Sequence, residues 1–315
     1  MITGASAGVG RATARAFARQ GAKVALIARS EDGLEAARTE CGNAIAIPTD
    51  VANAEEVERA AAAVEDELGP IEVWLNNAMA TVFSRFADTT PDEFRRATEV
   101  TYLGTVYGTM AALRRMLPRD RGTIVQVGSA LAYRSIPLQA PYCGAKAAIR
   151  GFTDSVRCEL LRERSRVHLT MVQLPALNTP QFELARTRLP RHPKPIPPIF
   201  QPEIAAEAIV WACSQRRREV YVGGSTVLAI LGNKLAPALG DLYLARTGYE
   251  AQQTRDPVEE SRPDNLFDCV PGDHGAHGIF EAESSRRSVQ LWLTRHRDWL
   301  VSAGAVALAA LARRR

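Results

Sequence analysis

Short apolar runs alternate with longer stretches of helical spacing over residues 1–222 of the chain. The apolar runs are rich in Val, Ile, Leu and Ala, and they cover 23–28, 43–47, 71–75, 123–127, 167–174 and 219–222. The stretches of helical spacing cover 11–20, 32–41, 54–68, 91–117, 142–164 and 202–215. Most of the apolar runs are continuous, which is typical of strands buried on both faces of a parallel sheet. The alternation predicts an α/β fold with a doubly wound parallel sheet in three layers.

The alternation stops between Leu174 and Pro202, where eight prolines fall. Proline disrupts regular hydrogen bonding, so we predict an irregular excursion over about 175–202. It follows a strand at the edge where such sheets bind ligands, and we interpret it as a semi-rigid lid. A proline-stiffened surface loop without a gating role is the alternative. We place the main domain at 1–230 and a C-terminal extension at 231–315.

Composition and charge exclude several classes of protein. The chain has 315 residues, 46% of them hydrophobic, and its 39 basic and 35 acidic side chains give a net charge of +4. This balance predicts a globular core and no nucleic-acid partner. Five cysteines without a C-x-x-C pair, and a start without a signal peptide, predict a cytoplasmic protein. His274 and His277 have no companion at metal-ligand spacing, so no metal site is predicted.

A glycine-rich turn, TGASAGVG over 3–10, stands directly before the first helical stretch. Gly4, Gly8 and Gly10 allow the backbone to turn sharply and to approach a pyrophosphate closely. The helix that follows offers free N–H groups and the positive end of its dipole. At the head of an alternating α/β pattern, this turn predicts a dinucleotide-binding site.

The end of the second apolar run bears on which dinucleotide is bound. A site for NAD usually has an acidic side chain there, about 20 residues past the glycines, to hold the ribose hydroxyls. This chain has Ala28 followed by Arg29. An arginine suits a 2′-phosphate, so the sequence favours NADP(H), with NADPH preferred over NADH. A solvated surface arginine is the alternative.

A possible catalytic group is formed by Ser129, Tyr142 and Lys146. Positions four apart share one face of a helix, so Tyr142 and Lys146 point the same way. A free tyrosine has a pKa of about 10. A nearby ammonium and the helix N-terminus are expected to lower the pKa of Tyr142. Ser129, at the end of an apolar run, can hold the oxygen of a substrate.

With these motifs the sequence resembles the short-chain dehydrogenase/reductase family over about residues 1–225. The matching features are TGASAGVG (3–10), Asp50-Val51, Asn76-Asn77-Ala78, Ser129, Tyr142-x-x-x-Lys146 and Pro175-x-x-x-Thr179. The resemblance implies a seven-stranded Rossmann sheet, hydride transfer at the nicotinamide C4, and a homo-oligomer.

The resemblance also implies roles for these residues. Tyr142 would be the general acid or base, Ser129 would orient the substrate oxygen, and Lys146 would hold the nicotinamide ribose and tune the tyrosine. The cofactor-binding residues implied by the motifs are Gly4, Ser6, Gly8, Val9, Gly10, Arg29, Asp50, Val51, Asn77, Tyr142, Lys146 and Thr179.

The sequence departs from the family pattern at three places. Thr101 replaces the usual asparagine of the fourth helix, which puts the proton relay to Lys146 in doubt. Ala176 replaces the glycine that usually follows the proline, and it is expected to reshape the nicotinamide pocket slightly. Only Met1 and Ile2 precede Thr3, where a central strand of about five residues is expected. We therefore hypothesise a translation start several codons upstream, which a stop codon immediately before Met1 would exclude.

The C-terminal extension is predicted to end in a short apolar helix. Residues 299–312 are uncharged and mostly apolar, with arginines on both sides. As a helix this segment would reach about 21 Å, short of the roughly 30 Å hydrocarbon core of a bilayer. Peripheral membrane contact through 299–315 is one interpretation, and packing on the domain or on a second subunit is the other.

The sequence thus predicts an NADP(H)-dependent oxidoreductase that interconverts a secondary alcohol and its ketone or aldehyde. The candidates to line an apolar substrate pocket are Leu131, Tyr133, Pro137, Gln139, Leu177 and Phe182. A nucleotide-binding interaction protein without turnover is the alternative, motivated by Thr101 and the short first strand. An isomerase or epimerase on the same scaffold also stays open.

Overall fold

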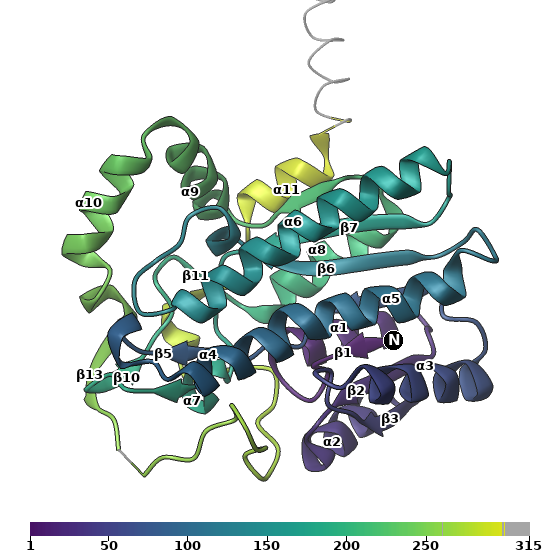
Figure 1. The fold of residues 1–315 in the computed structure, drawn as a ribbon, viewed down its shortest axis with the longest axis horizontal. Coiled ribbons are helices and arrows are strands. Elements are labelled where there is room, and N and C mark those ends of the chain that lie inside the picture. The colour runs from purple at the N-terminus through teal and green to yellow at the C-terminus, as the bar shows by residue number, and fades with distance from the viewer. Residues whose placement is uncertain (260, 298, 300–315) are drawn as a thin grey trace, which may run out of the picture.

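A computed structural model describes residues 1–259, 261–297 and 299 of the chain. Its centre is a parallel sheet of seven strands in the order β12-β7-β6-β4-β1-β2-β3 (Figure 1). In chain order the strands are β1 (Ile2–Thr3), β2 (Val24–Ala28), β3 (Ala44–Pro48), β4 (Val73–Asn76), β6 (Thr123–Ser129), β7 (His168–Leu174) and β12 (Glu219–Tyr221). The predicted doubly wound sheet is confirmed.

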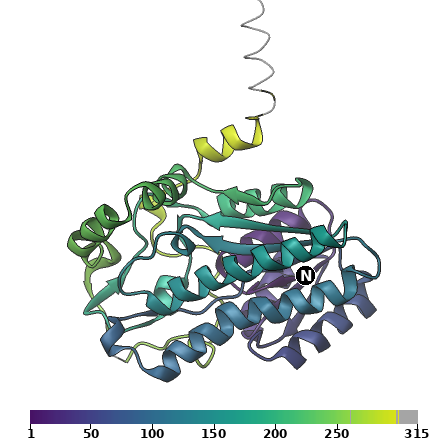
Figure 2. The ribbon, with the colours of Figure 1, turned by 45° about the horizontal axis from the view of Figure 1, so that its top comes forward.

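Helices cover both faces of the sheet (Figures 1 and 2). One face carries α1 (Gly8–Ala18), α2 (Glu31–Cys41) and α8 (Pro202–Ser214). The other carries α3 (Ala54–Leu68), α4 (Pro91–Thr98), α5 (Gly104–Met116) and α6 (Ala140–Arg162). Successive strand residues enter opposite cores, because side chains alternate along a strand. In β2, Leu26 packs with the first helices and Ile27 with the second.

The first strand is short, as the sequence indicates, yet it holds the central place. Ile2 lies opposite Leu26 of β2 and Leu75 of β4. The amino group of Met1 is buried and donates to the carbonyl oxygen of Val73 at 2.9 Å. Burial lowers the pKa of this amino group to about 5. The hypothesis of an upstream start stays a prediction.

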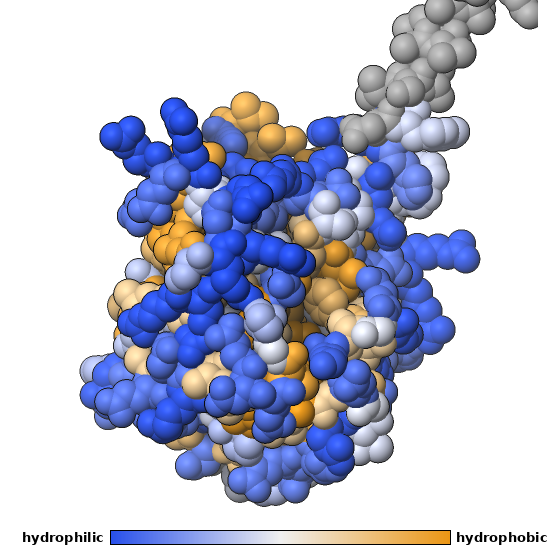
Figure 3. Space-filling view, turned by 90° about the vertical axis from the view of Figure 1, so that its right-hand side faces the viewer, coloured by the Kyte–Doolittle hydropathy of each residue, from blue (hydrophilic) through white to orange (hydrophobic). Residues whose placement is uncertain are grey.

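A cavity of about 310 Å³ lies beside this amino group, at the amino ends of the strands. Its walls are mainly apolar and include Ile2, Phe17, Val64 and Leu68. Figure 3 views the molecule from this side, where apolar surface is visible in hollows among hydrophilic side chains. The carboxyl ends of the strands, with the loops that follow them, lie at the opposite edge of the sheet.

The predicted helix over 91–117 is divided. A capping box of Thr90 and Glu93 begins α4, and a π-helical segment, Glu99–Leu103, separates α4 from α5. Within that segment the hydroxyl of Thr101 binds the backbone of Ala80, accepting from its N–H and donating to its carbonyl, both at 2.9 Å. Hydrophobic spacing does not reveal such a local widening, because it depends on a side-chain bond to another loop.

The proline-rich segment is more regular than the irregular excursion we predicted. It contains β8 (Ala176–Leu177), α7 (Gln181–Leu184), β9 (Arg186–Thr187), β10 (Arg191–Pro193) and β11 (Ile199–Phe200). Within the segment, β8 pairs with β11. The other pairings reach outside it: β9 with β5 (Val82–Phe83), β10 with β13 (Gln253–Pro257), and β11 with β14 (Ser284–Ser285). A small core of Phe83, Leu138, Phe182, Leu189, Ile199 and Phe280, with Ala185, lies beneath.

The C-terminal extension begins inside α9 (Gly224–Leu235), which is followed by α10 (Pro237–Thr247) and, later, by α11 (Val289–Arg295). None of the residues of α10 is buried. Both ribbon views show α9 and α10 at one end of the molecule (Figures 1 and 2). Their large exposed apolar side chains are Leu228, Leu231, Leu235, Leu239, Leu242 and Tyr243.

Short 3₁₀ turns complete the described chain, at Phe86–Asp88, Ala130–Ala132, Glu250–Gln252 and Glu281–Glu283. Apart from Trp299, the predicted terminal apolar helix lies outside the described residues. Within the described part of the chain, no helix is both long enough and apolar enough to cross a bilayer.

Candidate active site

The glycine-rich turn joins β1 to α1 at the carboxyl edge of the sheet. Gly4 and Gly8 have φ of +64° and +55°, which side chains rarely adopt. A Cβ atom on Gly10 would lie 2.1 Å from the carbonyl oxygen of Gly4. The turn therefore needs glycine for its backbone angles and for its close packing. Ala7, the residue before α1, offers no side-chain acceptor to the first N–H groups of the helix.

Two cavities lie along this edge of the sheet. The larger has about 440 Å³, and its walls include Val9, Asn77, Ser129, Tyr142, Lys146 and Thr179. The smaller has about 130 Å³, and its walls include Gly4, Ser6, Arg29, Asp50 and Val51. Met79 lines both cavities. The predicted site residues are thus brought to one edge, the catalytic group in the larger cavity and the adenosine-side residues in the smaller, with Gly8 and Gly10 in the turn.

Ser129, Tyr142 and Lys146 meet on one wall of the larger cavity. Ser129 is the last residue of β6, while Tyr142 and Lys146 lie in the first two turns of α6. The Lys146 Nζ atom is 5.6 Å from the centre of the Tyr142 ring and donates to the carbonyl oxygen of Val127 at 2.7 Å. The Ser129 hydroxyl accepts a hydrogen bond from the N–H of Leu131 at 3.1 Å, and its interaction with the Tyr142 phenol favours a lower pKa of that phenol.

Burial sets the protonation states of this group. It raises the pKa of Tyr142 to about 12, against a smaller lowering by the hydrogen bond with Ser129. It lowers the pKa of Lys146 to about 8, because a buried ammonium loses hydration. The expected lowering of the pKa of Tyr142 is therefore wrong for this structure, in which the Lys146 ammonium binds the Val127 carbonyl. At neutral pH the phenol of Tyr142 keeps its proton.

The substitution of threonine for asparagine at position 101 has a visible consequence. The hydroxyl of Thr101 is engaged at both donor and acceptor by Ala80, so it is not directed at Lys146. The carbonyl oxygen of Thr101 accepts from the hydroxyl of Thr105 at 2.8 Å. A relay through the side chain at this position is therefore absent from the observed arrangement.

The residues of the smaller cavity are tied to their neighbours. The Arg29 guanidinium donates to the carbonyl oxygens of Asn265 and Phe267 at 2.5 and 2.7 Å. The Asp50 carboxylate accepts from Arg96 at 2.5 Å. Asn77, which lines the larger cavity, donates to the carbonyl oxygens of Thr3 and Gly4, at 3.0 and 3.1 Å, and so fixes the glycine turn.

One wall of the smaller cavity was not predicted from the sequence. Asn265, Cys269, Val270 and His274 line it, although they lie in the polar stretch of the C-terminal extension. His277, the other histidine of that stretch, binds the Glu203 carboxylate at 3.0 Å. In the described chain, no group of three or more His, Cys, Asp or Glu side chains is placed to hold a metal ion.

The substrate side of the larger cavity matches the prediction in part. Leu131, Gln139, Leu177 and Phe182 line it, but Tyr133 and Pro137 do not. The Tyr133 hydroxyl donates to Glu219, and Pro137 packs against the backbone at Gly248. The remaining walls come from α9, α10 and the proline-rich segment, among them Lys194, Pro195, Ile196, Thr226, Leu228, Ala229, Gly232, Tyr243 and Leu244.

A parallel sheet with a glycine turn after its central strand and a Ser–Tyr–Lys group beside it defines a nucleotide-binding oxidoreductase. The family model described as "short chain dehydrogenase" matches residues 1–189. The chain belongs to the short-chain dehydrogenase/reductase family and is an enzyme of the oxidoreductase class. Members of this family use NAD(P), act on small molecules and commonly form oligomers.

Relatives share both sequence and fold with this chain. The uncharacterized oxidoreductase YxnA of Bacillus subtilis is 34% identical over 281 residues, 87% of this chain and 79% of that protein. A short-chain dehydrogenase from Streptomyces avermitilis superposes with a TM-score of 0.65 at 27% identity, covering 79% and 96% of the two chains. An alcohol dehydrogenase from Thermococcus sibiricus, solved with 5-hydroxy-NADP, gives 0.60 at 28%, covering 70% and 94%.

Proposed function

We propose that this protein is an NADP(H)-dependent oxidoreductase that interconverts a secondary alcohol and its ketone or aldehyde. The observation that carries the proposal is the meeting of Ser129, Tyr142 and Lys146 on one wall of a cavity of about 440 Å³. The glycine turn at the start of α1, with Val9 and Thr179 in the same cavity, leads from this wall towards the smaller cavity.

The residues present fit a dinucleotide. The glycine turn brings the backbone to the start of α1, and no side chain of the turn caps that helix. The positive end of the helix dipole favours a phosphate there. When bound, the nicotinamide supplies or accepts the hydride at its C4 atom.

The protein's own groups handle the proton. Ser129 holds the carbonyl oxygen through its hydroxyl, beside the phenol of Tyr142. In reduction the carbonyl carbon gains the hydride, and the carbonyl oxygen takes the phenolic proton. The Tyr142 phenolate that results is stabilised by the Lys146 ammonium and regains a proton from solvent. Oxidation of the alcohol runs the same steps in reverse.

The preference for NADP(H) rests on Ala28 and Arg29. No carboxylate stands at position 28, where NAD sites hold the ribose hydroxyls. Arg29 lines the smaller cavity and can present its N–H groups to a 2′-phosphate. The solved relative from Thermococcus sibiricus, with its bound NADP derivative, supports this assignment by similarity.

The walls of the larger cavity favour an apolar substrate. Leucine, proline, isoleucine and aromatic side chains predominate on the side away from the sheet. One buried hydroxyl in this wall, that of Thr226, has no hydrogen-bond partner. A mostly apolar carbonyl compound with a second polar group for Thr226 fits these walls.

Two further predictions concern partners. We propose a homo-oligomer, in keeping with the family, and a peripheral membrane contact through 299–315. In the described part, Trp299, the first residue of that segment, is exposed, as are Val289 and Trp292 shortly before it. Membrane fractionation with and without 299–315 tests the contact, and equal partitioning of both forms would contradict it.

Titration of the purified protein with NADPH and with NADH tests the cofactor assignment. Trp74 lies on β4, three residues before Asn77 of the larger cavity, so binding is expected to change tryptophan fluorescence. We expect clearly tighter binding of NADPH. Tighter binding of NADH would overturn the NADP assignment, and binding of neither would overturn the proposed function.

A further inference from the structure

A segment of the C-terminal extension, residues 262–281, crosses the cofactor side of the molecule and is called the strap here. It leaves the region of β13, passes the ends of β2 and α4, and then runs across the start of α1 (Figure 1). Four of its residues, Asn265, Cys269, Val270 and His274, line the smaller cavity. The strap therefore closes the adenosine side of the proposed cofactor site.

The strap occupies a backbone group that a dinucleotide needs. The N–H of Gly8, the first residue of α1, donates to the carbonyl oxygen of Gly275 at 3.0 Å. This N–H belongs to the glycine turn, where a phosphate oxygen is expected to accept. A carbonyl oxygen and a phosphate oxygen are both acceptors, so they compete for the same donor.

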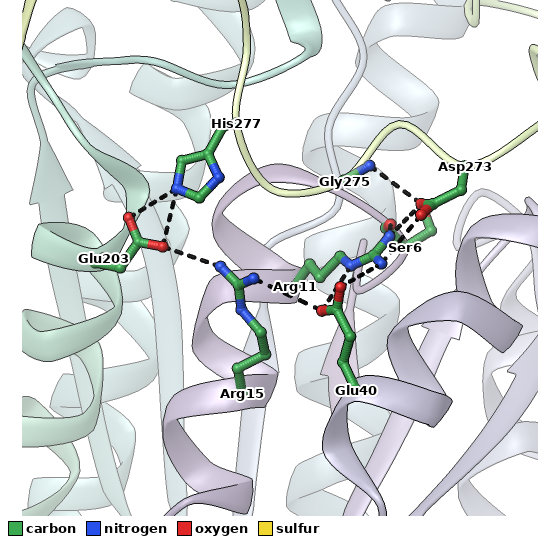
Figure 4. Close-up of polar contacts among 8 residues, drawn as sticks. All are labelled: Ser6, Arg11, Arg15, Glu40, Glu203, Asp273, Gly275 and His277. Atoms are coloured by element: carbon green, nitrogen blue, oxygen red, sulfur yellow. Dashed lines mark hydrogen bonds and ion pairs between the residues drawn. The ribbon is translucent and has the colours of Figure 1, made fainter. Parts of the chain in front are cut away.

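Charged groups hold the strap beside this contact. Figure 4 shows Asp273 directed at Arg11. The Arg11 guanidinium donates to both carboxylate oxygens of Asp273. Arg11 is only 2% exposed and is also bound by Glu40 at 2.7 and 3.0 Å. A few residues on, His277 binds Glu203 of α8 at 3.0 Å. Charge-assisted hydrogen bonds of this kind are stronger than neutral ones.

The preceding part of the strap is held at the end of β2. Arg29 donates to the carbonyl oxygens of Asn265 and Phe267. Leu266 is fully buried, and its carbonyl oxygen accepts from Arg96 at 3.2 Å. The side chain assigned to a 2′-phosphate is therefore engaged by the strap.

The space that remains is too small for half a dinucleotide. The smaller cavity has about 130 Å³, whereas pockets for ligands of this size measure roughly 300–1,000 Å³. Most of the walls opposite the strap belong to the sheet and to the turns that follow its strands, and several of their residues are packed into the two main cores. The strap supplies four of the lining residues, so its displacement would enlarge the cavity.

We propose that the strap is a gate on the cofactor site: it releases Gly8 to admit a dinucleotide and closes over the adenosine half. In the closed complex Cys269, Val270 and His274 become cofactor-contacting residues, additional to those of the family motifs. This inference rests on the proposed function. Its consequence is that opening of the strap limits both entry and release of the cofactor.

Stopped-flow mixing with excess NADPH tests the gate. Opening is a step within the protein, so the observed rate of binding is expected to level off as NADPH concentration rises. Asp273→Asn weakens the hold on the strap, while Arg11 keeps Glu40 as its partner. We expect this variant to raise the plateau rate and the rate of NADPH release about tenfold. Should it fail to fold, His277→Gln serves instead, with about a threefold effect.

A matched control and an independent readout complete the experiment. Glu35→Gln removes the exposed pair with Arg38 on α2 and is expected to leave both rates unchanged. Alkylation of Cys269, followed by mass spectrometry, reports the strap directly, with the exposed Cys158 of α6 as internal reference. Saturating NADPH is expected to slow alkylation of Cys269 at least about tenfold and to leave Cys158 unchanged.

The outcomes separate the two proposals. If neither dinucleotide binds at equilibrium to the wild type or to the strap variant, the proposed function fails and the gate fails with it. If NADPH binds, but the rate rises linearly with concentration and is the same in all variants, only the gate is overturned. A plateau that rises in Asp273→Asn and not in Glu35→Gln supports both.

Discussion

The two ends of the cofactor cleft are built in different ways. At the proposed catalytic end there is a cavity of about 440 Å³, whose walls come from the edge of the sheet, the start of α6, the proline-rich segment, α9 and α10. At the adenosine end only about 130 Å³ remains, because the strap lies across the glycine turn and Arg29. The difference lies in the strap: it lines the smaller cavity through Asn265, Cys269, Val270 and His274 but is absent from the walls of the larger one, so the proposed gate acts on the cofactor rather than on the substrate.

The largest expected effect is at the catalytic end. Tyr142→Phe removes the proton that the carbonyl oxygen takes, so turnover is expected to fall about a thousandfold. Affinity for NADPH is expected to stay the same, as measured by fluorescence titration. Tyr249→Phe removes an exposed phenol that lines neither cavity and serves as the control. Undiminished turnover in Tyr142→Phe would contradict the proposed mechanism.

Next in size is a change at the adenosine end. Arg29→Ala removes the donors for a 2′-phosphate, so affinity for NADPH is expected to fall about fiftyfold relative to affinity for NADH. The ratio is the informative quantity, because loosening of the strap affects both cofactors alike. Arg59→Ala, on the exposed face of α3, is the control. A ratio that does not change would identify Arg29 as a support of the strap alone.

The pH dependence of stability tests whether the Lys146 ammonium is shielded from water in the larger cavity. Lys146 has a pKa of about 8 in the folded protein, below its ordinary value of 10.5. Between pH 8 and 10.5 the unfolded chain therefore binds more protons at this lysine than the folded protein does. The contribution of Lys146 to the unfolding free energy consequently increases as the pH rises through this range. We expect the difference in unfolding free energy between wild type and Lys146→Met to shift by about 2 kcal/mol in favour of the wild type from pH 7 to 9.5.

Denaturant unfolding at several pH values measures this shift. The series stops at pH 9.5, because the raised pKa of Tyr142 has the opposite sign: above pH 10 the folded protein holds a proton that the unfolded chain releases. A constant difference between wild type and Lys146→Met across the range would show that the lysine is hydrated in the open cavity.

A smaller effect is expected in the substrate wall. Gly232 of α9 lines the larger cavity, and a Cβ atom there would meet no atom within 4 Å. Gly232→Phe is expected to raise KM for bulky apolar carbonyl substrates about tenfold, with KM for small ones and affinity for NADPH unchanged. Gly151→Phe, also free of contacts but on α6 outside the cavity, is the control. An equal change in KM for bulky and small substrates would show that the space beside Gly232 does not determine which substrates bind.

The same contrast separates what the sequence reveals from what it does not. The sheet, the glycine turn and the Ser129–Tyr142–Lys146 group follow from local patterns, because apolar runs, glycines and helical spacing act over a few residues. The strap could not be found in this way. Its decisive contacts join Gly8 to Gly275 and Arg29 to Phe267, and they use backbone carbonyl oxygens, which every residue possesses. The residues around Asp273 do not indicate that its partner is Arg11, which lies far away in the chain.

Other differences have equally physical causes. The division of the predicted 91–117 helix depends on hydroxyl bonds of Thr101, which apolar spacing cannot report. The pKa of Tyr142 depends on how deeply the ring is buried, which spacing on a helix does not determine. Tyr133 was expected in the substrate pocket from its place near Ser129, but its hydroxyl is held by Glu219.

The helix α10 forms part of the substrate wall through Tyr243 and Leu244, yet it buries none of its own residues. Substitutions at exposed positions usually change stability by less than about 0.5 kcal/mol. The wall that we propose to contact substrate therefore includes a helix on which the stability of the fold depends little. Variants with altered substrate range can accumulate there without loss of the folded state, which makes α10 the natural place to diversify in directed evolution.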